Sequence, residues 1–456
     1  MSKYSTACFK AYDIRGKVPS ELNGEMAYLI GNAFATHLHA KRTAVGFDIR
    51  LTSPSLAGDV IRGLNDAGCD AINIGMCGTE EVYHAVFSDP MLDGGVMVTA
   101  SHNPADYNGM KLVSKGSRPV GAETGLKDIK QRVARGDIYH AESRGSCAEI
   151  AKRSGYIAHL LNYISPKNFE GLKIVVNAGH GGAGLIIDEL EKALPAKFIK
   201  IYNEPDGSFP QGVPNPLLKE NQYSTAAAVV RHSADFGVAW DGDFDRCFLF
   251  DEEGGFIEGY YVVALLAEAF LSRSENAGEK IIHDPRLIWN TIDVVTARGG
   301  EPVVSKTGHA YIKEKMREED AVYGGEMSAH HYFRDFAYCD SGMIPWLLVA
   351  DKIGREGGSI RKFVEDYENN YPVSGELNYK VSDTSKLLEH VTRKYKGDSI
   401  DTEHLDGLSM QFENWRFNLR ASNTEPVVRL NVESRGSKAL LTDKKDEITE
   451  IINEYN

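Results

Sequence analysis

The stretch GGVMVTASHNP, residues 94–104, joins an apolar, β-branched run to a cluster of polar residues that ends in proline. The apolar part is typical of a buried strand. The polar part places the hydroxyl of Ser101, an imidazole and an amide at the end of that strand, where α/β proteins usually place their chemistry. Because a simple turn needs only Asn, Gly or Pro, the stretch predicts an α/β domain with a functional loop.

Two further stretches repeat this arrangement of an apolar run followed by polar residues. They are FGVAWDGDFDR, residues 236–246, and VYGGEMSAHH, residues 322–331. We interpret the three stretches as divergent copies of one strand-and-loop device. This hypothesis predicts one cleft lined by three loops of different chemistry.

Strand and helix patterns alternate through the first three quarters of the chain, as in sheets covered by helices. From about residue 373 the pattern changes to short alternating strands with two helices, typical of an antiparallel sheet. We therefore predict an α/β protein of three related α/β domains with mixed sheets and a smaller C-terminal α+β domain. The predicted domains span residues 1–153, 154–254, 255–368 and 369–456.

Composition limits the possible functions of the 456-residue chain. With 42% hydrophobic and 25% charged residues it can bury several cores, and its net charge of -14 gives no general attraction to nucleic acid or anionic membranes. The six cysteines form no CxxC pair, and no apolar run approaches the length of a membrane span. We expect a cytoplasmic protein with neither a nucleic-acid nor a membrane partner.

The stretch DGDFDR, residues 241–246, predicts a metal site. Asp241, Asp243 and Asp245 alternate, so in an extended conformation their side chains point to one side, about 7 Å apart. Carboxylate oxygens grouped in this way suit a hard divalent cation, and we expect Mg²⁺. Arg246 would then face a phosphoryl group bound at the same place.

A calcium loop is the alternative interpretation of this stretch. Acids occupy positions one, three, five and twelve of a window that ends at Glu252, as in an EF-hand. Position six, however, is Arg246 where that loop needs glycine, and both flanks are strand-like rather than helical. A calcium-regulated binding protein therefore stays the weaker hypothesis.

The stretch RASNTEPVVR, residues 420–429, predicts a phosphate-binding loop. Arg420 offers a fork of donors, and Ser422, Asn423 and Thr424 add hydroxyl, amide and backbone N–H groups. A hydroxyl nucleophile, a magnesium site and a separate phosphate clamp together indicate phosphoryl transfer to a substrate that already carries a phosphate. A metal-dependent phosphatase would use the same serine and acids but would not need the clamp.

Five motifs, FKAYDIRG, TASHNP, DGDFDR, GEMSAH and RASNTEP, occur in the order found in the α-D-phosphohexomutases, and the chain resembles that family over essentially its whole length. It is most similar to the bacterial phosphomannomutases of GDP-mannose biosynthesis, which supply polysaccharide synthesis. The resemblance implies four domains around one central cleft. It also implies that Ser101 carries a phosphoryl group, which contacts the Mg²⁺ held by Asp241, Asp243 and Asp245.

The resemblance further implies a mutase that interconverts mannose 6-phosphate and mannose 1-phosphate, with a hexose 1,6-bisphosphate as intermediate and activator. Lys111 and His330 align with family residues near the reacting oxygen, although the adjacent His331 leaves the choice open. The residues expected to bind the hexose phosphate substrate are Tyr12, Arg15, Arg286, Thr307, Gly308, His309, Glu326, Ser328, Arg420, Ser422, Asn423 and Thr424.

Three further expectations depend on less specific features. A dual-specificity enzyme acting on mannose and glucose phosphates is the alternative to mannose specificity, because the motif GEMS occurs in both kinds of enzyme. The chain is expected to be a monomer or a homodimer. The proline-rich stretch at residues 203–216 is expected to pack at a domain boundary.

Overall fold

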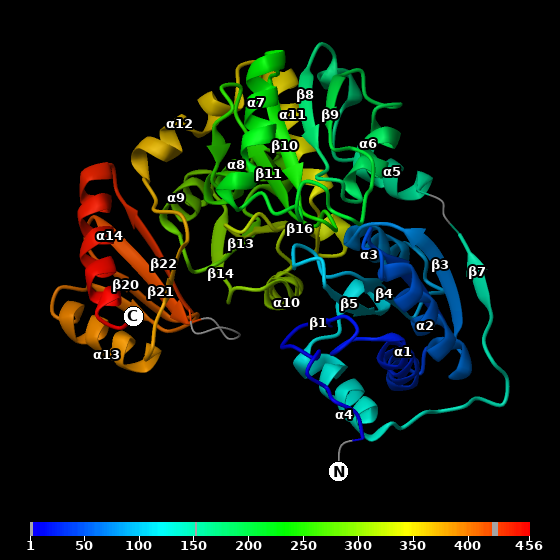
Figure 1. Cartoon of the computed structure of the whole chain (residues 1–456). Helices are drawn as coiled ribbons and strands as arrows, with labels where there is room; N and C mark the ends of the chain where they lie inside the picture. The colour runs from blue at the N-terminus through cyan, green and yellow to red at the C-terminus, as the bar shows by residue number, and fades with distance from the viewer. Residues whose placement is uncertain (1–2, 151–152, 422–426) are drawn as a thin grey trace. The chain divides into compact units, whose positions relative to one another are not determined.

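The computed structural model describes residues 3–150, 153–421 and 427–456 (Figure 1). The chain divides into two compact units. Unit 1 contains Met1–Phe256 and His330–Gly357, and unit 2 contains Ile257–Ala329 and Gly358–Asn456. Within the described residues, no helix has the length and apolar character needed to cross a membrane.

The first sheet of unit 1 has seven strands in the order β1–β5–β4–β2–β3–β7, with β6 paired to β5. It is mixed, because β2 is parallel to β3 and β4, whereas β5 is antiparallel to β4 and β1. The strands are Ile14–Lys17 (β1), Arg42–Phe47 (β2), Asp70–Met76 (β3), Gly94–Val98 (β4), Tyr107–Ser114 (β5), Arg118–Pro119 (β6) and Cys147–Glu149 (β7).

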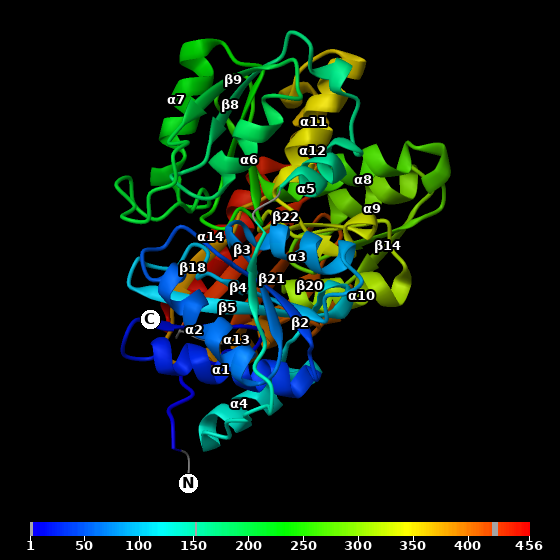
Figure 2. The same ribbon diagram turned by 90° about the vertical axis from the view of Figure 1, so that its right-hand side faces the viewer.

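Two helices of this region pack closely against each other, as Figures 1 and 2 show for α1 and α2. A Cβ atom on Gly31 would lie 2.3 Å from the carbonyl oxygen of Val60, and one on Gly63 would lie 2.1 Å from that of Tyr28. The two glycines therefore permit the close approach of the helices. The helices of this region are Gly24–Leu38 (α1), Ser53–Asp66 (α2), Thr79–Ser88 (α3) and Lys127–Arg135 (α4).

The second sheet of unit 1 has the order β12–β11–β10–β8–β9, in which β8 is parallel to β9 and β10 and β11 is antiparallel to β10. Its strands are Lys173–Asn177 (β8), Lys197–Ile201 (β9), Phe236–Trp240 (β10), Cys247–Phe250 (β11) and Phe256–Ile257 (β12). The remaining elements of unit 1 are Ser154–Leu161 (α5), Ala183–Leu190 (α6), Tyr223–His232 (α7), His331–Phe333 (β16), Cys339–Asp340 (β17) and Met343–Glu356 (α11).

Unit 2 begins with a parallel region in which β13 pairs with both β14 and β15. Its strands are short and are connected by helices, as in the sheets of unit 1. The elements are Gly259–Leu271 (α8), Lys280–His283 (β13), Trp289–Ala297 (α9), Glu301–Val304 (β14), His309–Glu319 (α10), Tyr323–Gly325 (β15) and Ile360–Asn370 (α12).

The C-terminal part of unit 2 is an antiparallel sheet in the order β18–β22–β21–β20–β19 with its own core, which includes the fully buried Phe417, Leu430 and Ile448. Its elements are Leu377–Lys380 (β18), Thr384–Tyr395 (α13), Asp401–Glu403 (β19), Leu408–Gln411 (β20), Trp415–Ala421 (β21), Val427–Ser434 (β22) and Lys438–Asn453 (α14).

The three parallel regions share one topology. In each, the strand that comes first in the chain, β2, β8 or β13, lies between the two parallel strands that follow it. The two later strands therefore lie on opposite sides of the central strand, which makes this place a topological switch point. In α/β sheets, ligands bind at the carboxyl ends of the strands beside such a point. The strands that precede the three quoted polar loops, β4, β10 and β15, all pair with a central strand at this point.

The predicted fold class is confirmed, because mixed α/β sheets are followed by an antiparallel sheet with two helices. The predicted boundaries of the four domains stay predictions, since the division into compact units follows a different line through the chain. The predicted central cleft also stays a prediction.

Candidate active site

Ser101 lies just beyond β4 in a strained and buried turn. Its φ of 48° is in the left-handed region, which is uncommon for residues other than glycine. The Oγ atom donates a hydrogen bond to Asp241 Oδ2 at 2.7 Å and lies 3.0 Å from His102 Nδ1. The structure thus brings the predicted nucleophile into contact with the first of the predicted metal ligands.

The acid loop, residues 241–246, is a turn between the antiparallel strands β10 and β11. The prediction that its acids alternate in an extended conformation is wrong, because Phe244 has a φ of 46° and its N–H donates to Asp241 O at 3.1 Å. The turn nevertheless brings carboxylate oxygens of Asp241, Asp243 and Asp245 within 4.8 Å of one another. Strands on both flanks also rule out the helix–loop–helix context of the calcium-loop alternative.

The acid cluster fits a hard divalent cation. The three carboxylates are buried, and among the described residues the Oδ1 atom of each has no hydrogen-bond partner. A buried carboxylate oxygen without a partner is costly unless a cation balances it. Oxygen ligands at this spacing are those preferred by Mg²⁺.

Lys111, on β5, lies between two of these acids. Its Nζ is 2.7 Å from Asp243 Oδ2 and 2.5 Å from Asp245 Oδ2. Burial opposes the charge of Lys111, but the two carboxylates outweigh it and raise the lysine pKa. Burial disfavours the ionised form of Asp243, but the Lys111 charge outweighs burial and lowers the pKa of that carboxyl. For Asp245, burial and the Asp243 charge prevail and raise the pKa to about 6.

Arg246 completes this side of the cluster. Its Nε and Nη2 donate to Asp241 Oδ2 at 2.9 and 2.6 Å, and Nη2 also contacts His102 Nδ1. The Arg246 charge, together with burial, holds the pKa of His102 well below its usual range. His102 is therefore neutral beside the hydroxyl of Ser101 at physiological pH.

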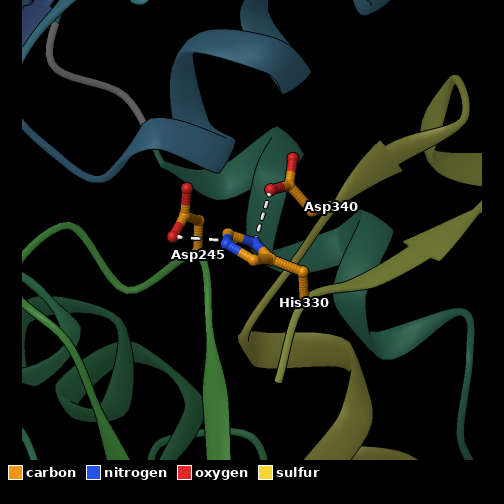
Figure 3. Close-up of side chains that lie close together, drawn as sticks. All are labelled: Asp245, His330 and Asp340. Carbon is orange, nitrogen blue, oxygen red and sulfur yellow. Dashed lines mark hydrogen bonds and ion pairs between the residues drawn. The ribbon is translucent and has the colours of Figure 1, made fainter. Parts of the chain in front are cut away.

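His330 reaches the same cluster from the segment before β16 (Figure 3). Its Nδ1 lies 2.9 Å from Asp340 Oδ2 and 4.0 Å from Asp245 Oδ1. The neighbouring His331 is fully buried, and burial lowers its pKa to about 3. The geometry therefore favours His330 over His331 as the histidine that acts in the site.

The N-terminal motif FKAYDIRG contacts the serine loop, residues 99–107. Arg15, on β1, donates through Nη1 to Asn103 Oδ1 at 2.7 Å and through Nη2 to Asp13 Oδ2 at 2.7 Å. Tyr12 lies half-buried just before β1. Arg15 thus contacts the loop of Ser101, and its expected contact with the hexose phosphate stays a prediction.

Arg286 is the centre of a second group of predicted residues, in unit 2. It is buried, and its guanidinium forms a two-point ion pair with Asp284 through Nε at 3.0 Å and Nη2 at 2.9 Å. Nη2 also lies 3.3 Å from Ser328 Oγ and 3.6 Å from Glu326 Oε1. Burial opposes its charge, but Asp284 and the other nearby acids raise the pKa of Arg286.

The loop before α10 joins the same group. The Gly308 N–H donates to Glu326 Oε1 at 3.1 Å, and His309 begins the helix. Among the described residues, the buried Oγ1 atom of Thr307 has no hydrogen-bond partner. The structure thus brings the predicted sugar-binding loops together around Glu326.

Glu376 links three arginines of unit 2. Its Oε2 accepts from Arg420 Nη2 at 3.0 Å and lies 3.5 Å from Arg286 Nη1, and its Oε1 lies 3.7 Å from Arg429 Nη1. Burial would raise the pKa of Glu376, but the three guanidinium groups lower it. Asp406 Oδ2 also lies 3.7 Å from Arg420 Nη1, and Asp284 pairs with Arg286, so several carboxylates share these three guanidinium groups. Arg420 and Arg429 offer the planar donor forks that bind a phosphate. The predicted Ser422, Asn423 and Thr424 lie outside the described residues.

Sequence reasoning missed three residues that contact the predicted ones. Thr79 Oγ1 donates to Asp243 Oδ2 at 2.5 Å, Asp340 binds His330, and Glu376 binds Arg420. Thr79 and Glu376 lie far from their partners in the sequence, whereas Asp340 is ten residues from His330 on the other strand of a hairpin. Only the strand pairing and helix packing of the folded chain bring them together.

Models of the four domains of one family match nearly the whole chain. They are described as phosphoglucomutase/phosphomannomutase alpha/beta/alpha domains I, II and III and the C-terminal domain, and they match residues 6–140, 154–255, 258–371 and 376–451. The order of the matches is that of the four predicted domains.

Individual relatives match over the same length. A phosphomannomutase of Salmonella montevideo is 56% identical over 98% of this chain and 99% of its own, and one of Escherichia coli K12 is 54% identical over the same shares. The crystal structure of a phosphoglucomutase/phosphomannomutase family protein from Burkholderia thailandensis superposes with a TM-score of 0.88 at 30% identity, covering 99% of this chain and 98% of that one. The chain therefore belongs to the phosphoglucomutase/phosphomannomutase family.

Proposed function

We propose that this chain is a phosphomannomutase, an isomerase that interconverts mannose 6-phosphate and mannose 1-phosphate. The observation that carries the proposal is the contact between Ser101 Oγ and Asp241 Oδ2 at 2.7 Å, inside an acid cluster of a chain 56% identical to a phosphomannomutase. Serine hydroxyls are weak nucleophiles, and this one lies where charge on a transferring phosphoryl group can be balanced.

Ser101 is the proposed carrier of the phosphoryl group. In the first step the bond between phosphorus and Ser101 Oγ breaks, and a bond to the free hydroxyl of the sugar phosphate forms. The resulting hexose 1,6-bisphosphate then returns its other phosphoryl group to Ser101, so no phosphate is consumed. The same bisphosphate would phosphorylate a serine that has lost its phosphate and would thus act as activator.

Asp241, Asp243 and Asp245, with a phosphoryl oxygen on Ser101, are the proposed ligands of Mg²⁺. When bound, Mg²⁺ supplies charge neutralisation for the transferring group. Arg246 adds a second positive charge beside Asp241, at hydrogen-bond distance from the carboxylate that meets Ser101 Oγ.

Lys111 and His330 are the proposed proton-transfer residues. The sugar hydroxyl gives its proton to a general base as it attacks, and the serine oxygen takes up a proton as its bond to phosphorus breaks. The Asp340 carboxylate fixes the orientation of the His330 ring through Nδ1. Although burial opposes its charge, the two carboxylates raise the pKa of Lys111, which favours its protonated form, the form that can give a proton as a general acid.

We assign binding of the sugar and its second phosphate to unit 2. The carboxylate of Glu326 and the hydroxyl of Ser328 suit ring hydroxyls, while Arg286 and Arg420 suit a phosphate dianion. The assignment extends to Tyr12 and Arg15 of unit 1 as phosphate contacts, and to Thr307, Gly308, His309, Ser422, Asn423 and Thr424.

The proposed cellular role is to supply mannose 1-phosphate for GDP-mannose and polysaccharide synthesis in the cytoplasm, by a monomer or homodimer with no nucleic-acid or membrane partner. A dual-specificity enzyme is the alternative, because mannose and glucose differ only in the orientation of the C2 hydroxyl. If a single hydrogen bond reads that hydroxyl, the discrimination is about 1–3 kcal/mol.

Phosphorus NMR tests the proposal. The protein is incubated with Mg²⁺ and a trace of hexose 1,6-bisphosphate, and with mannose 1-phosphate or glucose 1-phosphate in parallel samples. We expect the mannose ester to convert to its 6-phosphate much faster than the glucose ester, and Ser101→Ala to lower the rate by about three orders of magnitude or more. Equal rates would establish dual specificity, release of inorganic phosphate alone would favour the phosphatase, and no change in either ester would refute both.

A further inference from the structure

The three α/β regions carry the same turn at the end of their central strand. In each turn a side-chain oxygen accepts a hydrogen bond from the backbone N–H two residues later, at 3.0, 2.9 and 2.9 Å. The oxygen and N–H belong to Asp48 and Arg50 after β2, to Asn177, the last residue of β8, and Gly179, and to Asp284 and Arg286 after β13. The residue that donates this N–H is therefore an arginine in two of the three turns, Arg50 and Arg286, and a glycine in the other.

This turn lies beside a functional loop in each region. The central strand pairs in parallel with the strand that leads into the serine loop, the acid loop or the GEMS loop. Because carboxyl ends of parallel strands meet at one edge of the sheet, a side chain from the turn can reach the neighbouring loop. Arg50 and the serine loop meet in this way.

Arg50 uses all four of its terminal N–H bonds on the backbone of the serine loop. Nη1 donates to the carbonyl oxygens of Pro104 and Tyr107 at 2.8 and 3.0 Å. Nη2 donates to those of Ser101 and Asn103 at 2.8 and 2.6 Å. One planar guanidinium therefore fixes four peptide groups of the loop that carries the proposed nucleophile.

The guanidinium itself is held on its other sides. Arg50 is 2% exposed, and its Nε lies 3.4 Å from Asp48 Oδ2. Asp48 Oδ1 in turn accepts from Ser53 Oγ at 2.6 Å. The ring of Phe209, from the proline-rich loop, lies 5.3 Å from the guanidinium carbon, a cation–π distance. Arg50 thus has one fixed position from which to bind the loop.

The bond to the Ser101 carbonyl matters most for function. Ser101 has the left-handed φ of 48°, a conformation that persists in a residue with a side chain only when its surroundings impose it. Arg50 binds the carbonyl oxygen of Ser101, while the Oγ atom of the same residue meets Asp241. On the side of the acid loop, a Cβ on Gly242 would lie 2.8 Å from that carbonyl oxygen, so the loop is enclosed.

The equivalent arginine of unit 2 makes a related contact. Arg286 Nη2 lies 3.3 Å from Ser328 Oγ of the GEMS loop, and Asp284 Oδ2 accepts from the N–H of Met327 in that loop. In the second region Gly179 has no side chain, and the acid loop instead receives a backbone hydrogen bond, from Gly182 N to Gly242 O at 3.4 Å. The arginine is therefore a feature of the copies whose loops carry a functional serine.

We propose that Arg50 is a positioning residue for phosphoryl transfer, which keeps the serine loop in the one conformation that aligns Ser101 both to accept and to give a phosphoryl group. The inference rests on the proposed function of Ser101 as phosphoryl carrier. Arg50 contacts the loop backbone and not the reacting atoms, so it acts through geometry. Small misplacements of reacting groups slow transfer far more than they weaken binding.

The test is a single-turnover measurement. Protein labelled with ³²P at Ser101 is mixed with increasing mannose 1-phosphate, which gives both a transfer rate and an apparent dissociation constant. Arg50→Lys keeps the charge but offers one ammonium in place of the planar fork. We expect its transfer rate to fall by about tenfold or more, while the apparent dissociation constant changes by less than about twofold, because the sugar-binding residues are untouched.

Arg153→Lys is the matched control, because Arg153 also binds a backbone carbonyl, but that of Met76 at the end of β3. Phe209→Leu is a second variant that leaves Arg50 in place and removes only the ring above it. We expect the control to transfer at the wild-type rate and Phe209→Leu to lose about twofold to fivefold, with melting temperatures measured for all.

The outcomes separate the inference from the function on which it rests. If the wild type transfers its phosphoryl group and Arg50→Lys transfers at the same rate, the inference about Arg50 is wrong but the proposed function stands. The same holds if Arg153→Lys loses as much of the transfer rate as Arg50→Lys. If Arg50→Lys does not fold, an unchanged rate in Phe209→Leu would overturn the inference. If labelled wild-type protein transfers nothing to either hexose phosphate, the proposed function itself fails.

Discussion

Lys111 is the residue on which the charge balance of the acid cluster depends. Its ammonium bridges Asp243 and Asp245, which are both buried. Without a divalent cation, Lys111 and Arg246 are the positive groups that the structure places in contact with the acid loop. Removing one partner of a buried ion pair leaves the other charge buried and unpaired. The free-energy cost of that unpaired charge exceeds the net stabilisation that the intact pair provides.

We therefore predict that Lys111→Ala destabilises unit 1 by about 3 kcal/mol in EDTA. Because a divalent cation can neutralise the same carboxylates, Mg²⁺ should raise the melting temperature of the variant more than that of the wild type. Thermal unfolding in EDTA and in Mg²⁺ measures both effects.

Lys115→Ala, in the exposed turn after β5, is the control for the loss of a lysine. It should melt like the wild type under both conditions. Equal Mg²⁺ shifts in Lys111→Ala and wild type would contradict the assignment of the acids as metal ligands.

Asp340 sets the orientation of His330. A carboxylate can only accept from Nδ1–H, so it selects one tautomer, whereas an amide can present either an acceptor or a donor. Asp340→Asn should lower kcat by about tenfold or more and leave the melting temperature nearly unchanged.

The exposed Asp335 on the same hairpin supplies the control Asp335→Asn, which should keep full activity. Steady-state kinetics with mannose 1-phosphate measures kcat for both variants. If the kcat of Asp340→Asn lies within twofold of the wild-type value, the orientation of His330 by Asp340 does not matter for the reaction, and the prediction is wrong.

The sequence predicted which acids converge but not how. The one-residue spacing of Asp241, Asp243 and Asp245 was sufficient to indicate a cation site, but the left-handed φ of Phe244 replaces the expected extended backbone by a turn. A bulky aromatic at positive φ has no sequence signature, because its conformation is imposed by tertiary packing. The same limit hid Arg50, whose four acceptors lie more than fifty residues away.

At the scale of elements, helix α3 connects two parts of unit 1 to the acid cluster. Thr79, its first residue, binds Asp243, and the buried Glu80 accepts from the N–H groups of Gly342 and Met343 at the start of α11 at 3.1 and 3.2 Å. A carboxylate at a helix N-terminus satisfies donors that have no partner within the helix. One turn of α3 thus fixes both α11 and a predicted metal ligand.

The middle of α3 carries a titratable group, His84. His84 lies among the rings of Phe87, Tyr156 and His159, with centroids 5.2 to 5.6 Å away. Burial, reinforced by the nearby His159, lowers the pKa of His84 to about 4. Between that value and the unfolded pKa of about 6.5 the unfolded chain binds more protons, so stability is lost as pH falls through this window.

We predict that His84→Phe weakens the pH dependence of stability. At pH 5 the loss caused by His84 is about 1–2 kcal/mol, so the fall in melting temperature between pH 7.5 and pH 5 should be smaller by about 2 °C or more in the variant. His140→Phe, at an exposed histidine, should show the wild-type fall. Identical falls in all three proteins would mean that His84 titrates normally in the fold.

Elements were more predictable than the contacts between them. Periodicity indicated the alternation of strands and helices in the first three quarters of the chain and the strands that precede the three functional loops. Capping and hydrophobic spacing act within a few residues, so one sequence is sufficient to detect them. The contact of Thr79 with Asp243 joins residues more than 150 positions apart, and the strand order that creates it is not encoded locally.

At the scale of the whole molecule, the proposed chemistry is divided between the two units. The residues around the acid cluster, including Ser101, Lys111 and His330, all belong to unit 1. Arg286, Glu326 and the arginines around Glu376 belong to unit 2. Within each unit, hydrogen bonds and ion pairs connect the members of one set, so we expect each set to respond to its own ligand.

Hydrogen–deuterium exchange with mass spectrometry can resolve this division. We predict that Mg²⁺ alone slows exchange in the segments around residues 99–111 and 240–247, because it would tie together loops of unit 1 that otherwise depend on Lys111 and Arg246. Adding mannose 1-phosphate should slow exchange around residues 284–290 and 376–380 of unit 2, where Arg286 and Glu376 lie.

Asp243→Asn is the control that separates the two responses. It removes one proposed ligand, so it should abolish the Mg²⁺ effect in unit 1, while the response of unit 2 to the sugar phosphate is kept because its arginines are unchanged. Protection of unit 2 by Mg²⁺ alone, or loss of both responses in Asp243→Asn, would show that the units do not bind metal and sugar phosphate separately. In that case the networks around Asp243 and Glu376 would have to be coupled in solution, and the assignment of one ligand to each unit would be wrong.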